Sequence, residues 1–210
     1  DVIAKILYFN RNIKKHVKNQ EEHLWKFEQS THEIFGSTIG IIGAGSIGKH
    51  VAERMKVFKT KVIGYKRHLE HLEYFDKIYT TKEGLCELLK ESDYVICAIP
   101  LTNETRYIID AKALSLMKNS AIIINVSRGE IIDQEALKKA LINDQIRGAA
   151  LDVVTPEPLP ETDDLWDIDN CFITPHNASA SPKVDERIAM EIIDTFKKFM
   201  NQEKLDNKVV

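Results

Sequence analysis

Three side chains that could bind a carboxylate and transfer a proton follow short apolar runs of the sequence: Arg128, Glu157 and His176. An arginine binds a carboxylate through paired, charge-assisted hydrogen bonds and polarises a neighbouring carbonyl. A histidine can donate a proton to an alkoxide as it forms, and a carboxylate bonded to the imidazole fixes its tautomer. Together, the three groups fit the reduction of a 2-keto acid by hydride transfer.

Each of these residues also has a purely structural interpretation. Arg128 could cap a turn, Glu157 could be a solvated loop acid, and a histidine after a proline, as at His176, often only supports the fold. Their shared placement favours the chemical interpretation, because ligands of open α/β sheets bind outside the carboxyl ends of the strands. If the three preceding strands are neighbours, at a spacing of ~4.8 Å, the side chains reach one cleft.

A glycine-rich segment, residues 43–48 (GAGSIG), connects an apolar run to a helix-like stretch. In a strand-to-helix turn the first glycine permits the tight bend, the second lets a pyrophosphate approach the backbone, and the third lets the helix pack on the strand. The helix N-terminus adds N–H groups and a partial positive charge. The alternative is a turn that only packs a helix on a sheet. We predict that a dinucleotide is bound at Gly43, Gly45 and Gly48.

The next predicted strand, residues 61–65, ends in Lys66 and Arg67 rather than in an acidic residue. An acid about 20 residues after the turn usually bonds the ribose 2′-hydroxyl, whereas a cation there suits a 2′-phosphate. No acidic residue occurs from position 54 to position 69. We therefore predict NADP as the preferred cofactor, with Lys66 and Arg67 near the phosphate. NAD is the alternative, in which case the basic residues form a solvated face.

The elements that must hold these residues follow from the pattern of apolar runs. Short runs without strict alternation are typical of strands buried on both faces, and here they alternate with helix-like stretches. The predicted strands are 38–43, 61–65, 77–79, 93–98, 121–126, 146–151 and 171–174. The predicted helices are one long first helix from Val2 to Val17, then 46–58, 81–90, 111–117 and 133–142, and a last helix from Ser181-Pro182 to near Gln202. This order predicts an α/β fold, a Rossmann-type doubly wound parallel sheet with flanking inter-domain helices.

Composition limits the class of protein and its partners. The chain has 210 residues and a formal net charge of −3, which argues against nucleic acid and against a polybasic membrane patch. No stretch reaches the roughly 18 apolar residues needed to cross a bilayer, and the charged N-terminus is not a signal peptide. Cys86, Cys97 and Cys171 are widely spaced and odd in number, which predicts reduced thiols in a cytoplasmic protein. The remaining histidines lack metal-ligand spacing, so no metal site is expected.

The sequence also resembles the D-isomer-specific 2-hydroxyacid dehydrogenase family. The similar segments occur in order and at family-like spacing: residues 39–48 (IGIIGAGSIG), 100–105 (PLTNET), 125–129 (NVSRG), 151–153 (LDV) with 156–160 (PEPLP), and 174–179 (TPHNAS). The resemblance implies that Arg128 binds the substrate carboxylate, that His176 is the acid–base group and that Glu157 is its partner. It also implies that Asp152 meets the nicotinamide carboxamide and that the cofactor is contacted by Ser46, Ile47, Pro100, Thr105 and Val126.

Two departures from the family pattern are visible. Lys66 stands where family members frequently carry an acid. Family members also carry an N-terminal lobe of roughly 100 residues, one small domain's worth, before the first helix of this chain. We therefore expect residues 1–30 to be the inter-domain helix and linker, residues 31–178 the dinucleotide-binding domain, and residues 179–210 a helix returning towards the missing lobe. The apolar surface of the terminal helices is expected to be exposed or covered by a partner, and the resemblance implies a homodimer.

Three functions remain open from the sequence. The favoured one is an oxidoreductase that moves hydride between NADP(H), or NAD(H), and a small 2-keto or 2-hydroxy acid such as glyoxylate or hydroxypyruvate. The second is a truncated cofactor-binding module with little or no catalysis. A weaker third is another Rossmann enzyme, for example one acting on an amino acid.

Overall fold

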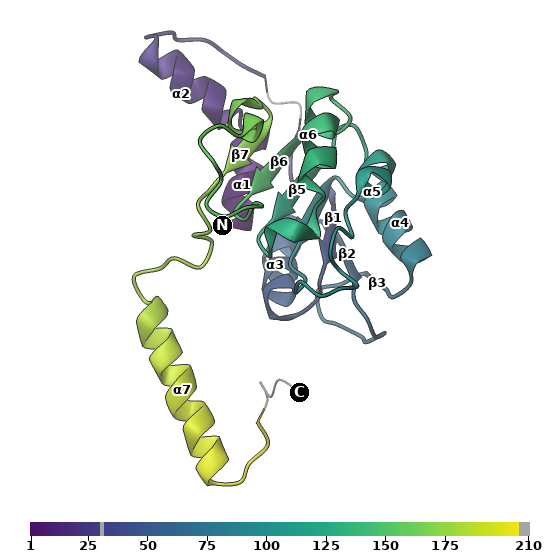
Figure 1. Ribbon diagram of the computed structural model, residues 1–210, viewed down its shortest axis with the longest axis vertical. Helices are drawn as coiled ribbons and strands as arrows, with labels where there is room; N and C mark the ends of the chain where they lie inside the picture. The colour runs from purple at the N-terminus through teal and green to yellow at the C-terminus, as the bar shows by residue number, and fades with distance from the viewer. Residues whose placement is uncertain (30–31, 206–210) are drawn as a thin grey trace. The chain divides into compact units, whose positions relative to one another are not determined.

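The computed structural model describes residues 1–29 and 32–205 (Figure 1). Its centre is a seven-stranded sheet in the order β3-β2-β1-β4-β5-β6-β7, and every neighbouring pair is parallel. The strands are β1 Thr38–Ile42, β2 Lys61–Tyr65, β3 Lys77–Tyr79, β4 Tyr94–Cys97, β5 Ile122–Asn125, β6 Gly148–Leu151 and β7 Cys171–Ile173. Successive strands are added on one side of β1 up to β3 and on its other side from β4 onward, so the switch point where ligands of such sheets bind lies between β1 and β4. The predicted doubly wound α/β fold is confirmed.

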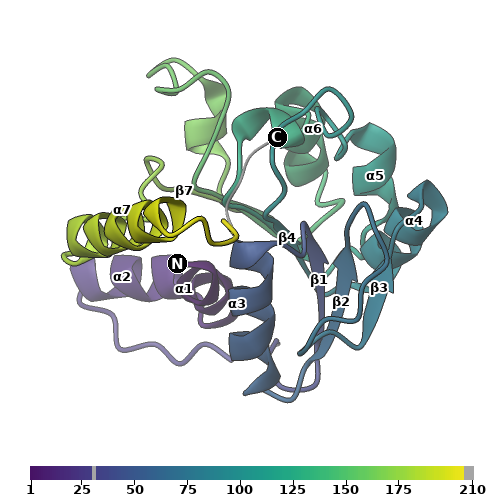
Figure 2. The same ribbon diagram turned by 90° about the horizontal axis from the view of Figure 1, so that it is seen from below.

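Helices cover both faces of this sheet (Figure 2). The helices that precede β7 in the chain are α1 Val2–Asn10, α2 Ile13–Glu21, α3 Ser46–Lys56, α4 Lys82–Glu91, α5 Ala111–Leu116 and α6 Gln134–Ile142. A last helix, α7 Val184–Met200, follows β7 in the chain and belongs to a separate compact unit. Two short 3₁₀ turns, η1 Gly129–Ile131 and η2 Asp164–Asp167, follow β5 and β6. One apolar core joins the sheet to α4, α5 and α6, and the other joins it to α1 and α3.

The strands divide their side chains between the two cores. In β4, Val95 and Cys97 enter the core under α4–α6, whereas Tyr94 and Ile96 enter the core under α1 and α3. All four residues are at most 2% exposed. Because both faces are buried, the strands appear in the sequence as continuous apolar runs, which is why their positions could be predicted closely.

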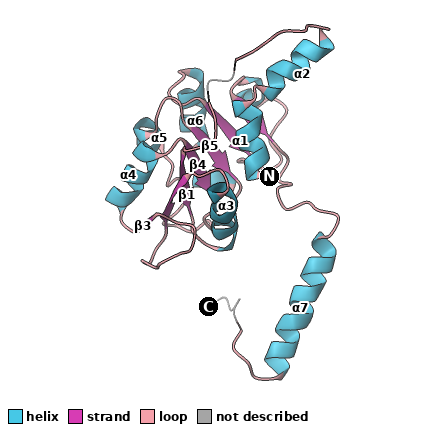
Figure 3. Cartoon of the chain, turned by 180° about the vertical axis from the view of Figure 1, so that it is seen from behind, coloured by secondary structure: helices cyan, strands magenta, loops and turns pink. Residues whose placement is uncertain are grey.

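The first helix differs from the prediction. One long helix was expected through Val17, but the structure has two, separated at Asn12, whose φ of 48° is left-handed. Asparagine is one of the few residues that adopts this conformation readily. The break lets α1 pack on the sheet, with Ile6 fully buried, while α2 and the segment after it extend away from the sheet (Figures 1 and 3).

The chain divides into two compact units, Asp1–His176 and Asn177–Val210. The second unit contains α7, which begins at Val184 rather than at the predicted Ser181-Pro182. No residue of α7 is buried. Among the described residues, no helix is long and apolar enough to cross a membrane.

Candidate active site

A histidine and a glutamate meet at the carboxyl edge of the sheet. His176 Nδ1 lies 2.8 Å from Glu157 Oε2, and the two side chains are 48% and 36% exposed. Glu157 lies in the loop after β6, where its Oε1 also accepts a hydrogen bond from the Val154 N–H at 3.1 Å. With Nδ1 bonded to Glu157, Nε2 is the ring nitrogen that can exchange a proton with a ligand.

The backbone of His176 is also held by hydrogen bonds. Its φ is 49°, and its N–H donates to the carbonyls of Asp152 (2.7 Å) and Thr174 (2.9 Å). These bonds fix His176 against the ends of the two neighbouring strands β6 and β7. A backbone anchored by these two hydrogen bonds fits a residue that must present its ring to a ligand outside the strand ends.

Arg128 lies on the loop after β5, next to the loop that carries Glu157. A Cβ added at Gly129 would lie 2.1 Å from the Val154 carbonyl oxygen, so the two loops touch. The Arg128 side chain is exposed, and its Nη1 donates to the Ser127 carbonyl at 2.5 Å. The structure therefore joins His176 and Glu157 directly and places Arg128 on the adjacent strand end, with its guanidinium turned to its own loop.

The glycine turn between β1 and α3 has the geometry expected of a phosphate cradle. Gly43 has a φ of 102°, and a Cβ there would lie 2.4 Å from the Ala98 carbonyl oxygen. A Cβ at Gly48 would lie 2.2 Å from the Gly43 carbonyl oxygen, whereas a Cβ at Gly45 would meet nothing within 4 Å. The first and third glycines thus permit packing, and the second leaves open space at the start of an eleven-residue helix. This arrangement fits a pyrophosphate, which needs both the space and the helix N-terminus.

Lys66 and Arg67, the basic residues predicted to bind a 2′-phosphate, follow β2, and an acidic residue lies close to Lys66. Lys66 Nζ is paired with Glu70, one residue beyond the stretch without acids. The hydrogen bond from Lys66 lowers the pKa of the Glu70 carboxyl. Arg67 is exposed. A phosphate would therefore compete with Glu70 for Lys66.

The other predicted cofactor contacts lie at the same edge of the sheet. The Thr105 hydroxyl donates to the Pro100 carbonyl at 2.7 Å and accepts from the Thr102 N–H at 2.7 Å, so it braces the loop after β4. Val126 follows β5 and is half-buried. Ser46 and Ile47, in the first turn of α3, are both exposed.

Asp152 is the buried member of the site, at 2% exposure. Thr174 Oγ1 donates to its Oδ1 at 2.5 Å, and Lys5 Nζ of α1 lies 3.7 Å from the same oxygen. Lys5 was absent from the sequence prediction, since nothing in a helical pattern tells which distant strand end a lysine will meet. The only available signal was its position beside the apolar Val2 and Ile6.

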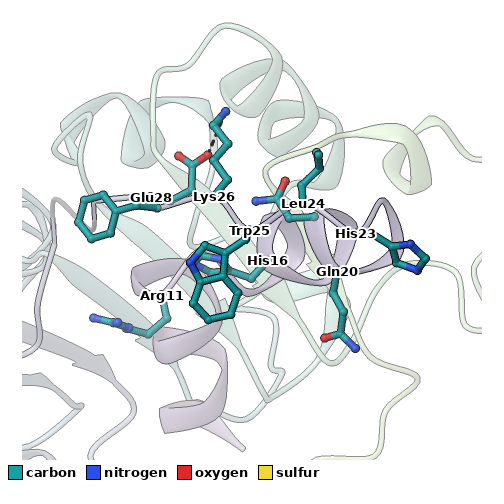
Figure 4. Close-up of a pocket in the computed structure, with 10 residues that line it drawn as sticks. Arg11, His16, Gln20, His23, Leu24, Trp25, Lys26 and Glu28 are labelled. Atoms are coloured by element: carbon teal, nitrogen blue, oxygen red, sulfur yellow. Dashed lines mark ion pairs between the residues drawn. The ribbon is translucent and has the colours of Figure 1, made fainter.

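A hollow of about 670 Å³ lies away from this edge, along α2 and the segment that follows it (Figure 4). Trp25 and Phe27 on its wall are 105% and 87% exposed. Lys26 and Glu28 form an ion pair of 3.3 Å there. Within residues 1–29 and 32–205, no cluster of three His, Cys, Asp or Glu side chains could hold a metal ion.

A parallel sheet with a glycine-rich turn at its switch point is typical of a dinucleotide-binding domain, and here an imidazole–carboxylate pair lies at the same edge of the sheet, after β6 and β7. Comparison with known proteins gives the family. The model of the D-isomer specific 2-hydroxyacid dehydrogenase NAD binding domain matches residues 3–178, and the chain belongs to that family.

Relatives with recorded names agree with this assignment. The chain is 42% identical over 158 residues to a glyoxylate reductase of Pyrococcus furiosus, covering 75% of this chain and 46% of that one. It is 36% identical over 177 residues to a D-3-phosphoglycerate dehydrogenase of Methanocaldococcus jannaschii, covering 84% and 34%. The chain therefore spans about half or less of the length of these relatives.

Solved structures share the fold over the full chain. A D-isomer specific 2-hydroxyacid dehydrogenase from Xanthobacter autotrophicus Py2, in complex with NADPH and MES, superposes with a TM-score of 0.86 at 30% identity. The match covers 100% of this chain and 85% of that one.

Proposed function

We propose that the protein to which this chain belongs is an oxidoreductase that transfers hydride between NAD(P)H and a small 2-keto or 2-hydroxy acid. The observation that carries the proposal is the 2.8 Å contact between His176 and Glu157, which follow β6 and β7 at the same edge of the sheet as the glycine turn after β1. The named relatives act in the same chemical class, one of them as a glyoxylate reductase. Glyoxylate and hydroxypyruvate are the substrates that we expect.

The mechanism divides the work among three side chains. The bound dinucleotide supplies hydride to the keto carbon. Arg128 turns from the Ser127 carbonyl to the substrate carboxylate and orients the keto group. His176 Nε2 donates a proton to the keto oxygen as the alkoxide develops, while Glu157 holds Nδ1 and orients the ring. The product is the 2-hydroxy acid, and His176 is left neutral until it takes up a proton from solvent.

The dinucleotide would be held along the carboxyl edge. Gly45 and the N–H groups of Ser46 and Ile47 would hold its pyrophosphate, and Asp152 would meet its nicotinamide carboxamide. We assign to cofactor contact the residues Gly43, Gly48, Pro100, Thr105 and Val126.

Steady-state oxidation of NADPH in the presence of glyoxylate or hydroxypyruvate tests this function. Turnover with either acid supports it. NADPH binding without turnover supports instead a cofactor-binding module, and faster turnover with amino acids would favour the third candidate. The assay is made on the 210-residue chain, so turnover shows directly whether this chain carries the activity by itself.

We propose NADP as the preferred cofactor. Lys66 and Arg67 follow β2 where a 2′-phosphate would lie, and a relative of known structure contains NADPH. Glu70 weakens this preference, because it already neutralises Lys66. The KM values for NADPH and NADH decide the question, and a lower KM for NADH would reject the proposal.

We also propose that two copies of the chain form a homodimer in the cytoplasm. Support comes from the segment after α2, in which Trp25 and Phe27 expose large apolar surfaces beside an open hollow. Apolar patches of this kind usually mark protein contacts. The free thiols Cys86, Cys97 and Cys171 fit a reducing compartment. Light scattering should give a dimer mass for the wild type and a monomer mass for the double variant Trp25→Ser/Phe27→Ser; a monomeric wild type would exclude the dimer.

The domain boundaries are a further part of the proposal. We assign dinucleotide binding to residues 31–178, and the connections to a substrate-binding lobe to residues 1–30 and 179–210. The exposed apolar side chains of α7, among them Ile192 and Phe196, support a partner for the last segment.

A further inference from the structure

Lys5 is a buried lysine at the end of the molecule where the active site lies. It sits on the packed face of α1 beside Ile6 and is 1% exposed. Lysine is almost never buried to this extent unless it is paired. Its Nζ donates to both carboxylate oxygens of Asp1, at 2.6 and 2.5 Å, and lies 3.7 Å from Asp152 Oδ1. Burial lowers the pKa of the Lys5 ammonium, and the charge of Asp152 opposes that shift.

Asp152 connects Lys5 to the proposed acid–base group. Its carboxylate faces Lys5 and Thr174, with the Thr174 hydroxyl 2.5 Å from Oδ1. Its backbone carbonyl accepts the His176 N–H at 2.7 Å. A displacement of Asp152 would therefore move the hydrogen-bond acceptor that holds His176 in place. Lys5 is the cation that opposes such a displacement, because a buried carboxylate without a counter-charge is strongly disfavoured.

We propose that Lys5 is a positioning residue for the nicotinamide end of the cofactor and acts through Asp152. It holds the Asp152 carboxylate in place, so that this residue would meet the carboxamide through its side chain while its backbone carbonyl holds His176. The inference rests on the proposed function, since it assigns Asp152 to the cofactor. It adds a residue of the N-terminal helix to a site otherwise built from strand ends.

Charge rescue tests this inference. Lys5→Met keeps the length and apolar stem of the side chain and removes the charge. We expect it to raise the Kd for NADPH about tenfold, which is the size of a lost charge-assisted contact. We also expect it to lower the folding equilibrium constant by roughly a hundredfold, because it removes the lysine counter-charge of the buried Asp152 carboxylate. The double variant Lys5→Met/Asp152→Asn removes both charges and should recover much of the lost stability.

The matched control is Lys14→Met. Lys14 also pairs with a carboxylate, that of Asp169 at 3.0 Å, but the two side chains are 55% and 100% exposed. Exposed ion pairs contribute little, so this variant should bind NADPH and unfold like the wild type. Fluorescence titration with NADPH and urea denaturation give the two readouts.

Each outcome decides between a charge role and a packing role. Lys5→Met that binds NADPH as tightly as Lys14→Met would overturn the inference, as would a double variant no more stable than Lys5→Met. If Lys5→Met does not fold, a folded double variant still supports the charge pair, and an unfolded one rejects it. Failure of the proposed function looks different: the wild type would then turn over neither keto acid, while the denaturation results would still report on Lys5 and Asp152.

Discussion

Gly45→Ala separates a dinucleotide cradle from a turn that only packs a helix. The structure leaves nothing within 4 Å of a Cβ at position 45, and the backbone there (φ −87°, ψ −154°) is extended and open to alanine. The variant should therefore fold, losing no more than about 1 kcal/mol from a poorer helix cap. A pyrophosphate that uses this space would meet the new methyl group. We expect the Kd for NADPH to rise at least about tenfold, or ~1.4 kcal/mol.

Gly48→Ala is the matched comparison, because its Cβ would lie 2.2 Å from a backbone oxygen that cannot move freely. Overpacking of this kind costs about 1–3 kcal/mol, so Gly48→Ala should lower the free energy of unfolding more than Gly45→Ala does. Urea denaturation and fluorescence titration with NADPH give the two quantities for each variant. A Gly45→Ala protein with wild-type affinity for NADPH would refute the reasoning, because the open space would then have no role in binding.

Further predictions concern the acid–base pair, the cofactor and the thiols. His176→Ala should abolish keto-acid turnover and leave the Kd for NADPH nearly unchanged; retained turnover would remove His176 from its role. Glu157→Gln should lower kcat about 10²-fold or more, a typical contribution of assisted proton transfer, and an unchanged kcat would contradict the pairing. Glu70→Gln should lower the KM for NADPH and not the KM for NADH, because it releases Lys66 to bind the 2′-phosphate. Equal changes in the two KM values would show that Lys66 does not bind this phosphate. Burial raises the pKa of the Cys97 and Cys171 thiols to about 12, so mass spectrometry after iodoacetamide treatment at neutral pH should find both unlabelled in the native protein.

The sheet could be predicted from the sequence because its strands are buried on both faces. Runs such as Ile122–Asn125 lie between two apolar cores and therefore carry apolar residues at successive positions. The break between α1 and α2 could not be predicted in this way, since the apolar spacing continues through it. It depends on one residue, Asn12, in a left-handed conformation. The start of α7 was also placed early, at a proline that lies before the helix.

The sequence predicted the site residues that directly follow strands. It did not predict the contact that a helix far away in the sequence makes with a strand end. His176 and Glu157 are 19 positions apart, and their meeting was expected on the condition that the strands before them are neighbours, as β6 and β7 are. Lys5 lies far from Asp152 in the sequence, and only the packing of α1 on the sheet brings them together. Glu70 lies directly after the acid-free stretch of residues 54–69, and the turn of the chain after β2 brings it back to Lys66.

The most direct test is a crystal structure of the protein with NADPH and oxamate, an unreactive analogue of a 2-keto acid. The account predicts that the Arg128 guanidinium binds the oxamate carboxylate, and that His176 Nε2 lies within hydrogen-bond distance of the oxygen that replaces the keto group. The nicotinamide should lie on the opposite side of the analogue. A complex in which oxamate binds elsewhere, or in which Arg128 and His176 face away from it, would contradict the account.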